Sequence, residues 1–217
     1  MPALVIFGAG NFLGDVFDCA LTLGLRLHRL VLNQEETVGP RDRSFRDRLA
    51  LLADPPRVIG LAEFQPGPDE AYALAPTMPA RRALVEELKS RHGLVFQPLI
   101  HPTAYVSPLA RVGEGCFVGV QATLAPGVVL EPFVVINRAA SIGHDTQVGC
   151  YARIMPGVHI GGLVAVGPRT MVGIGATVID RIRLGADSLV AAGAAVTRDV
   201  GDRVLVAGVP AQVKKAL

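Results

Sequence analysis

Long hydrophobic runs, paired cysteines and a strong net charge are all missing from this 217-residue sequence. Half of the residues are hydrophobic, yet no run of about 18 apolar residues occurs, so we expect no membrane-spanning helix. The net charge of only +2 gives no reason to expect nucleic acid or a membrane surface as a partner. The amino-terminal segment lacks the basic residues of a secretory signal, and we therefore expect a cytoplasmic location.

Cysteine is scarce and its spacing is uninformative. Cys19, Cys116 and Cys150 are odd in number and fit no CxxC or zinc-binding spacing. We expect buried thiols, no disulfide framework and no metal site.

The most informative feature that is present is a strict six-residue repeat of aliphatic side chains. A period of six fits neither a helix nor a simple alternating strand, and it is typical of a parallel β-helix. Each hexapeptide then forms one flat side of a triangular coil of eighteen residues, with its aliphatic residue pointing inward. The seventeen positions are Ile100, Val106, Val112, Val118, Leu124, Leu130, Ile136, Ile142, Val148, Ile154, Ile160, Val166, Val172, Val178, Leu184, Val190 and Val196.

The repeat divides the chain into two predicted domains, 1–96 and 97–217. The second is the β-helix with a carboxy-terminal cap from residue 199 onward. The first lacks the repeat and alternates strand and helix signals, which predicts a small α/β domain of Rossmann-like βαβ type. Its expected elements are strands at 3–7, 27–32 and 72–75, helices ending near Gly24 and spanning 79–92, a surface helix or loop at 41–48 and a solvated loop at 54–68.

A glycine-rich turn follows the first predicted strand. Gly8, Gly10 and Gly14 form GxGxxxG before a helix, where backbone N–H groups and the positive helix end can face a phosphate. The alternative is that the glycines only permit a tight turn. Asn33 and Gln34 follow the second strand, where a dinucleotide fold would offer an acidic residue to a ribose, so a nucleotide sugar is favoured over NAD.

His144 is the candidate catalytic residue of the repeat region. It stands between Gly143 and Asp145, and a neighbouring carboxylate orients an imidazole and raises its basicity, as a general base requires. Gly162 lies eighteen residues later, so its N–H should stack beside His144 and donate to a thioester oxygen. His159 occupies a different slot of the repeat, and we expect it to be structural or exposed.

These motifs, together with an HP linker, an Asn…HD segment, a PGV turn and a VAGVPA tail, resemble the sugar O-/N-acyltransferases of the NeuD/PglD type. The resemblance covers essentially the whole chain. It implies a left-handed β-helix, a homotrimer with active sites between neighbouring coils, and transfer of an acetyl group from acetyl-CoA to a nucleotide-linked amino sugar.

The resemblance also implies roles for individual residues. His144 matches the general base, Asp145 its acidic partner and Asn137 a polar contact to substrate. The remaining matches are Gly162, Ile174 and Ala192 along the CoA arm, Gly8, Gly10, Asn11 and Phe12 in the phosphate-binding turn, and Asn33 and Gln34 at the nucleotide.

Some residues depart from the family pattern. Relatives usually carry Gly-His at Asn11-Phe12 and an acidic pair at Asn33-Gln34, and the segment 76–78 replaces another expected substrate contact. Arg153 stands where some relatives place a second histidine near the acetyl group, and an arginine there could hold a phosphate or carboxylate.

Three alternatives to N-acetyl transfer stay open. The same base would serve an O-acetyltransferase acting on a sugar hydroxyl. A non-catalytic nucleotide-sugar-binding protein could keep the fold and not bind CoA. A β-helical carbonic anhydrase would need three histidines around one metal, but His101, His144 and His159 occupy different slots of the repeat.

Overall fold

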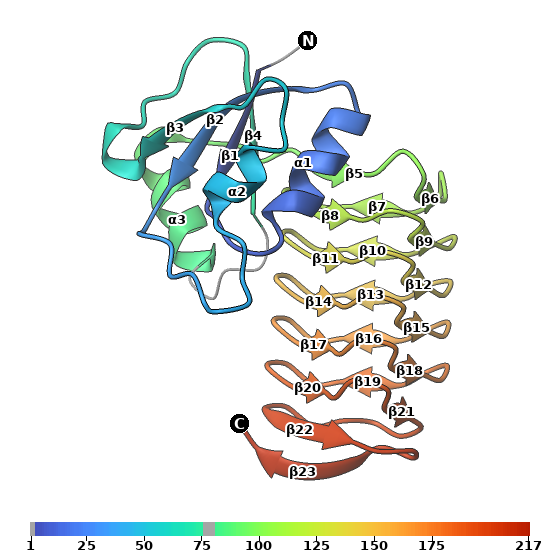
Figure 1. Ribbon diagram of the computed structural model, residues 1–217. Helices are drawn as coiled ribbons and strands as arrows, with labels where there is room; N and C mark the ends of the chain where they lie inside the picture. Colours follow the sequence, from blue (N-terminus) through green and yellow to red (C-terminus); the bar gives the residue numbers. More distant parts are fainter. Residues whose placement is uncertain (1–2, 76–80) are drawn as a thin grey trace. The chain divides into compact units, whose positions relative to one another are not determined.

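The computed structural model describes residues 3–75 and 81–217, and these divide into two compact units, Met1–Leu99 and Ile100–Leu217 (Figure 1). The expected helix start at Pro79 and the segment 76–78 lie outside the described residues. In the part of the chain that is described, no helix has the length and apolarity needed to cross a bilayer.

The first unit contains a parallel four-stranded sheet with the strand order β3-β2-β1-β4 (Figure 1). Its two inner strands are the most apolar, since β1 and β2 carry the fully buried Leu4, Ile6, Leu30 and Val31. Helix α1 buries Leu13 and Val16 among other apolar residues. The elements are β1 (Ala3–Phe7), α1 (Leu13–Thr22), β2 (Arg26–Leu32), α2 (Phe45–Leu49), β3 (Arg57–Gly60), the 3-10 helix η1 (Leu61–Glu63), β4 (Glu70–Leu74) and α3 (Arg81–His92).

The expected loop at 54–68 is a wrong prediction in part, because it contains β3 and η1. Strand β3 lies at the edge of the sheet, and only Ile59 of its four residues is fully buried. An edge strand with a single buried side chain leaves little periodic signal in a sequence. The helix expected within 41–48 begins with a capping box between Ser44 and Asp47.

The second unit is a parallel β-helix, in which stacked coils form three sheets, one on each side of the coil (Figure 1). From β6 to β21, the parallel partners lie eighteen residues apart, as Ile142 and Ile160 do. The predicted coil of eighteen residues is therefore confirmed.

The strands of this unit are only two residues long until the chain reaches its last two. The eight-stranded sheet contains β5 (Leu99–Ile100), β8 (Phe117–Val118), β11 (Val135–Ile136), β14 (Arg153–Ile154), β17 (Met171–Val172), β20 (Leu189–Val190), β22 (Val204–Ala207) and β23 (Gln212–Ala216). The six-stranded sheet contains β6 (Tyr105–Val106), β9 (Thr123–Leu124), β12 (Ser141–Ile142), β15 (His159–Ile160), β18 (Thr177–Val178) and β21 (Ala195–Val196). The five-stranded sheet contains β7 (Arg111–Val112), β10 (Val129–Leu130), β13 (Gln147–Val148), β16 (Ala165–Val166) and β19 (Arg183–Leu184).

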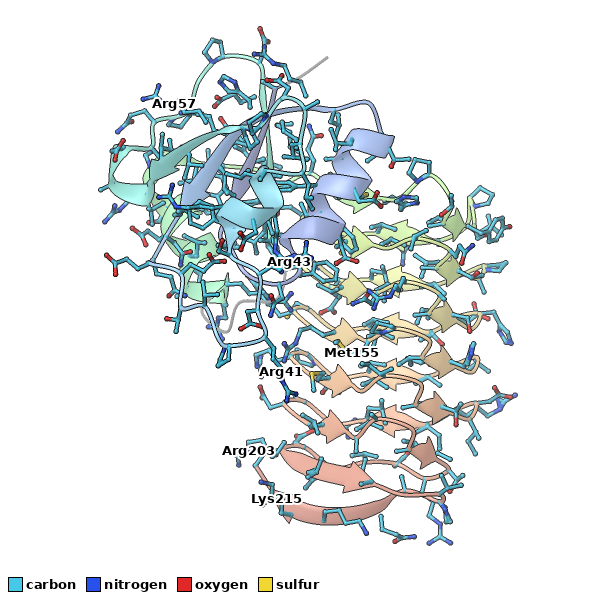
Figure 2. All side chains as sticks on the ribbon, in the orientation of Figure 1. Arg41, Arg43, Arg57, Met155, Arg203 and Lys215 are labelled. Carbon is cyan, nitrogen blue, oxygen red and sulfur yellow. The ribbon has the colours of Figure 1, made fainter. Side chains whose placement is uncertain are left out.

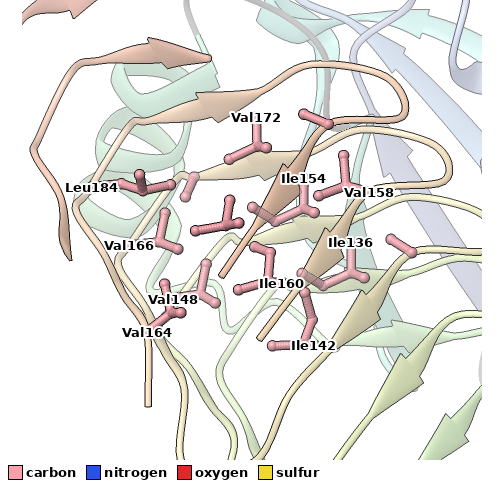
Figure 3. Packing of buried hydrophobic residues seen from close by; sticks show 14 of the residues in the cluster. Ile136, Ile142, Val148, Ile154, Val158, Ile160, Val164, Val166, Val172 and Leu184 are labelled. Atoms are coloured by element: carbon pink, nitrogen blue, oxygen red, sulfur yellow. The ribbon is translucent and has the colours of Figure 1, made fainter. Parts of the chain in front are cut away.

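The aliphatic residues of the six-residue repeat form the core of the coil (Figure 3). All of them from Val118 to Val196 are buried, and each such side chain stabilises the fold by about 1.5–3 kcal/mol. Ile100, Val106 and Val112 are partly buried because the first coil has a neighbouring coil on one side only. This continuous column holds the corners of the triangle at fixed positions.

The coil ends in an antiparallel pair, β22 and β23. Arg203 and Lys215 lie on this end of the unit (Figure 2). Strand β22 is parallel to β20, whereas β23 runs the opposite way, so the eighteen-residue stacking stops here.

Candidate active site

Candidate site residues of the second unit fall mainly at two corners of the triangular coil. The turns that follow the six-stranded sheet form the histidine corner, which comprises residues 107–110, 125–128, 143–146, 161–164 and 179–182. The turns that follow the eight-stranded sheet form the asparagine corner, which comprises residues 101–104, 119–122, 137–140, 155–158, 173–176 and 191–194. Residues eighteen apart lie above one another within each corner.

His144 and Asp145 form a hydrogen-bonded pair at the histidine corner. The distance from His144 Nδ1 to Asp145 Oδ2 is 2.9 Å, and the side chains are 62% and 59% exposed. A carboxylate only accepts, so Nδ1 carries the proton and Nε2 keeps its lone pair when the ring is neutral. The pair therefore offers an oriented imidazole whose free nitrogen can take a proton from a ligand.

Two glycines on the adjacent coils make room for this pair. A Cβ on Gly162 would lie 2.5 Å from His144 Nε2, and a Cβ on Gly127 would collide with the Asp145 carboxylate. Asp145 adopts a left-handed backbone with φ 57°, which aspartate tolerates better than most residues. The imidazole thus rests directly on the Gly162 backbone, as the spacing of eighteen predicts.

The Gly162 N–H, which is expected to donate to a thioester oxygen, already has an acceptor in this structure. It donates to Asp180 Oδ1 at 3.0 Å. The Gly162 carbonyl in turn accepts from the Arg181 N–H at 2.9 Å. Asp180 lies one coil beyond Gly162, and its side chain is exposed.

A buried threonine supports the same turn from inside the coil. The Thr146 hydroxyl donates to the Gly161 carbonyl at 3.0 Å and accepts from the Val164 N–H at 3.2 Å. Because Thr146 is fully buried, these bonds fix the path of residues 161–164 under the His144 ring.

The other predicted residues of the coil lie away from the histidine corner. Ile174 and Ala192 stack at the asparagine corner, where Ile174 is 56% exposed, and Arg153 lies on β14. Asn137 is also at the asparagine corner, but it is only 4% exposed and its Oδ1 accepts from the Arg138 N–H at 2.7 Å. The Asn137 side chain is therefore not open to a substrate in this structure.

The remaining histidines of this unit lie apart from His144. His101 Nδ1 contacts Thr103 Oγ1 at 2.8 Å in the asparagine corner, whereas His159 Nδ1 contacts Ser141 Oγ at 2.7 Å on the six-stranded sheet. Within residues 3–75 and 81–217, no three His, Cys, Asp or Glu side chains gather as metal ligands would.

The first unit contains a pocket of about 520 Å³ at the carboxy-terminal ends of β2 and β3. Two predicted residues, Asn33 and Gln34, line it, and the carboxy-terminal ends of parallel strands are where open α/β sheets bind ligands. Its lining residues are Leu32, Asn33, Gln34, Glu35, Gly60, Leu61, Ala62, Glu87 and Arg91.

The glycine-rich turn does not line this pocket, and its groups are largely engaged. The Gly8 N–H donates to Val31 O at 2.9 Å. The Asn11 amide donates to Asp42 at 2.7 Å and its carbonyl accepts from Arg48 at 2.8 Å. Gly8 and Gly10 have φ of 96° and 124°, a conformation that requires glycine.

Phe12 was expected among the ligand-binding residues of this turn, but its side chain is buried. Its side chain is only 7% exposed and belongs to the apolar core, so only its backbone could face a ligand. The acidic Asp15 in the first turn of α1 also opposes an anion at that helix end. Donation from the Asn11 amide, and then from the Gly39 N–H, holds the pKa of Asp42 below its usual value.

Sequence reasoning missed several residues of these sites. Asp180 could have been found by adding eighteen to Gly162, and Thr146 by its place as a polar residue facing the core. Glu87 and Arg91 of α3 form an ion pair at 3.0 Å and line the pocket. Tertiary packing brings them there, and no local sequence pattern predicts it.

Stacked hexapeptide coils after an α/β unit are the architecture that the resemblance to sugar acyltransferases predicts. No protein-family model and no curated protein matches the sequence, so comparison with solved structures carries the resemblance.

PerB from Caulobacter crescentus, solved in complex with CoA and GDP-perosamine, is 28% identical over 99% of this chain and 98% of its own, with a TM-score of 0.82. The acetyltransferase domain of PglB from Neisseria gonorrhoeae FA1090 is 28% identical over 99% of this chain and 100% of its own, with a TM-score of 0.83. WeeI from Acinetobacter baumannii AYE, at 19% identity, 98% and 99% coverage and a TM-score of 0.76, shows the shared fold alone. The predicted resemblance to sugar acyltransferases is confirmed.

Proposed function

We propose that this protein transfers an acetyl group from acetyl-CoA to the amino group of a nucleotide-linked amino sugar. The observation that carries the proposal is the His144–Asp145 pair, whose Nδ1 to Oδ2 distance is 2.9 Å and whose free Nε2 lies against Gly162. This is a positioned base beside a bare backbone, where a thioester and an amine can approach together.

His144 acts as the general base in this mechanism. It takes a proton from the acceptor amine at Nε2 as the nitrogen attacks the thioester carbonyl, and Asp145 stabilises the resulting imidazolium. The C–N bond forms, the C–S bond breaks, and the proton held by His144 passes to the departing sulfur. Proton and electron pair thus balance without a metal.

The solved relatives support both substrates. PerB was solved with CoA and GDP-perosamine, and a PglB acetyltransferase domain with acetyl coenzyme A. Structures of the Caulobacter perosamine N-acetyltransferase were also solved for histidine-to-asparagine and histidine-to-alanine variants. We propose that His144 is the counterpart of that histidine.

The first unit is proposed to bind the nucleotide as a Rossmann-like domain. The pocket of about 520 Å³ is large enough for a base and ribose, and Asn33 and Gln34 supply amide donors and acceptors. Glu35 and Glu87 add carboxylates, which favour a base that presents N–H donors, as guanine does.

A homotrimer is part of the proposal, because within one chain two of the residues assigned to CoA lie at a different corner from the base. Ile174 and Ala192 lie at the asparagine corner, whereas His144 lies at the histidine corner. A neighbouring copy that packs its asparagine corner against the histidine corner would complete each site. Light scattering that shows a monomer at micromolar concentration would contradict this arrangement. The cytoplasmic location stays a prediction.

The test is an acetyl-transfer assay with acetyl-CoA and GDP-, UDP- and dTDP-linked amino sugars, read by product mass. His144→Ala should lower the rate by roughly two to four orders of magnitude while the melting temperature stays nearly constant, because the side chain is exposed. Equal turnover in the variant would exclude His144 as the base. An acetyl ester product would indicate O-acetylation, and sugar binding without CoA binding would indicate a non-catalytic protein.

A further inference from the structure

We propose that Asp180 is a specificity-determining residue for the acyl donor, because it competes with the thioester carbonyl for the Gly162 N–H. The inference rests on the proposed function and deepens it. Strands β12, β15 and β18 follow one another in the same sheet (Figure 1), so the turns that carry His144, Gly162 and Asp180 form three successive levels of the histidine corner.

The geometry places Asp180 within the site. Its Oδ1 accepts from the Gly162 N–H at 3.0 Å, and the His144 Nε2 lies 2.5 Å from where a Gly162 Cβ would be. With ordinary bond lengths added, Asp180 Oδ1 and His144 Nε2 are no more than about 8.5 Å apart. The His144 imidazole and the Asp180 carboxylate therefore contact Gly162 from the two neighbouring coils, one on each side.

Only one acceptor can take this N–H with good geometry. An acyl-transfer reaction develops negative charge on the thioester oxygen, and a backbone N–H stabilises that charge when it points at the oxygen. A carboxylate on the same N–H blocks the donor and repels the charge. Asp180 must therefore turn away before the acyl group is bound productively.

The side chain is free to do so. Asp180 is exposed, so its carboxylate can rotate into water without leaving a buried charge behind. Breaking an exposed carboxylate–amide hydrogen bond and replacing it with a carbonyl–amide bond lowers the affinity for the thioester group by about five-fold. The rest of the CoA molecule has no carbonyl at this position and is not affected.

The experiment compares acetyl-CoA with S-ethyl-CoA, a thioether that lacks the carbonyl oxygen. Isothermal titration of the full-length protein gives the ratio of their dissociation constants for the wild type and for Asp180→Ala. We expect Asp180→Ala to shift this ratio about five-fold in favour of acetyl-CoA. Asp180→Asn keeps a neutral acceptor oxygen and should shift it in the same direction by less.

Asp202 provides a matched control. Its Oδ1 accepts from the Ala186 N–H at 2.8 Å at another corner, and it also lies against a glycine, Gly185. Asp202→Ala removes the same kind of carboxylate–amide bond and should leave the ratio unchanged.

An unchanged or reversed ratio in Asp180→Ala, with the protein still folded, would overturn the inference. A shift of equal size in Asp202→Ala would overturn it as well. If Asp180→Ala does not fold, Asp180→Asn decides. Failure of the proposed function is a separate outcome, since the wild type would then bind neither CoA compound.

Discussion

Placing a methyl group under the His144 ring should slow catalysis strongly without unfolding the protein. In Gly162→Ala, the new Cβ would lie 2.5 Å from Nε2, 2.8 Å from Cε1 and 2.9 Å from Cδ2 of His144. Ordinary contacts need about 3.5 Å or more, so the ring must move by about 1 Å. A displacement of about 1 Å at a reacting group lowers a rate by about 100-fold.

Stability should change little, by less than about 1 kcal/mol, because the atoms in the way belong to an exposed side chain that can rotate. Gly162 has no positive φ, and alanine keeps its N–H, so the backbone and the donor survive the change. The assay measures kcat/KM for acetyl transfer together with a urea unfolding curve. Gly201→Ala is the control, since a Cβ there meets nothing within 4 Å.

A double mutant separates displacement of the imidazole from other effects. In the His144→Ala background there is no ring to displace, so Gly162→Ala should cost nothing further. Wild-type activity in Gly162→Ala, or an equal additional loss in the double mutant, would refute the view that Gly162 is required as the support of the imidazole.

Two further predictions concern stability. Gly143→Ala should lower the free energy of unfolding by about 2 kcal/mol or more in urea unfolding, because its Cβ would lie 2.6 Å from Gly162 N and backbone cannot rotate away; wild-type stability would contradict this. Burial, and then the charge of Asp18, raise the pKa of the Cys19 thiol from 9.0 to about 12. The folded pKa is the higher one, so the contribution of Cys19 is fully present below pH 9 and is lost as the pH rises toward 12. Unfolding curves at pH 8 and 10.5 should show a larger loss for the wild type than for Cys19→Ala, and equal losses would contradict the assignment.

The β-helix could be predicted almost completely from the sequence. In the first unit β1, β2, β4, α1 and α3 lie close to their expected positions, whereas β3 and η1 were expected to be loop. The six-residue period predicts that residues such as Ile142 and Ile160 are buried, because it places them on the same inward face of the coil. In the first unit, β3 is an edge strand with Ile59 as its only buried residue, so its sequence shows no hydrophobic periodicity that would predict a strand. Phe12 stands in the expected ligand turn but is buried, because the apolar side chain gains more from the core than from an exposed turn.

The candidate site shows where this kind of prediction ends. Adding eighteen to a residue number gives the neighbour on the next coil, and this rule places Gly162 under His144, as the structure does. The same addition reaches Asp180, but it cannot say which way an exposed carboxylate turns. That rotation decides whether the Gly162 N–H is open to a thioester or already taken, so the repeat fixes the positions of the reacting groups while a single side-chain torsion governs access to one of them.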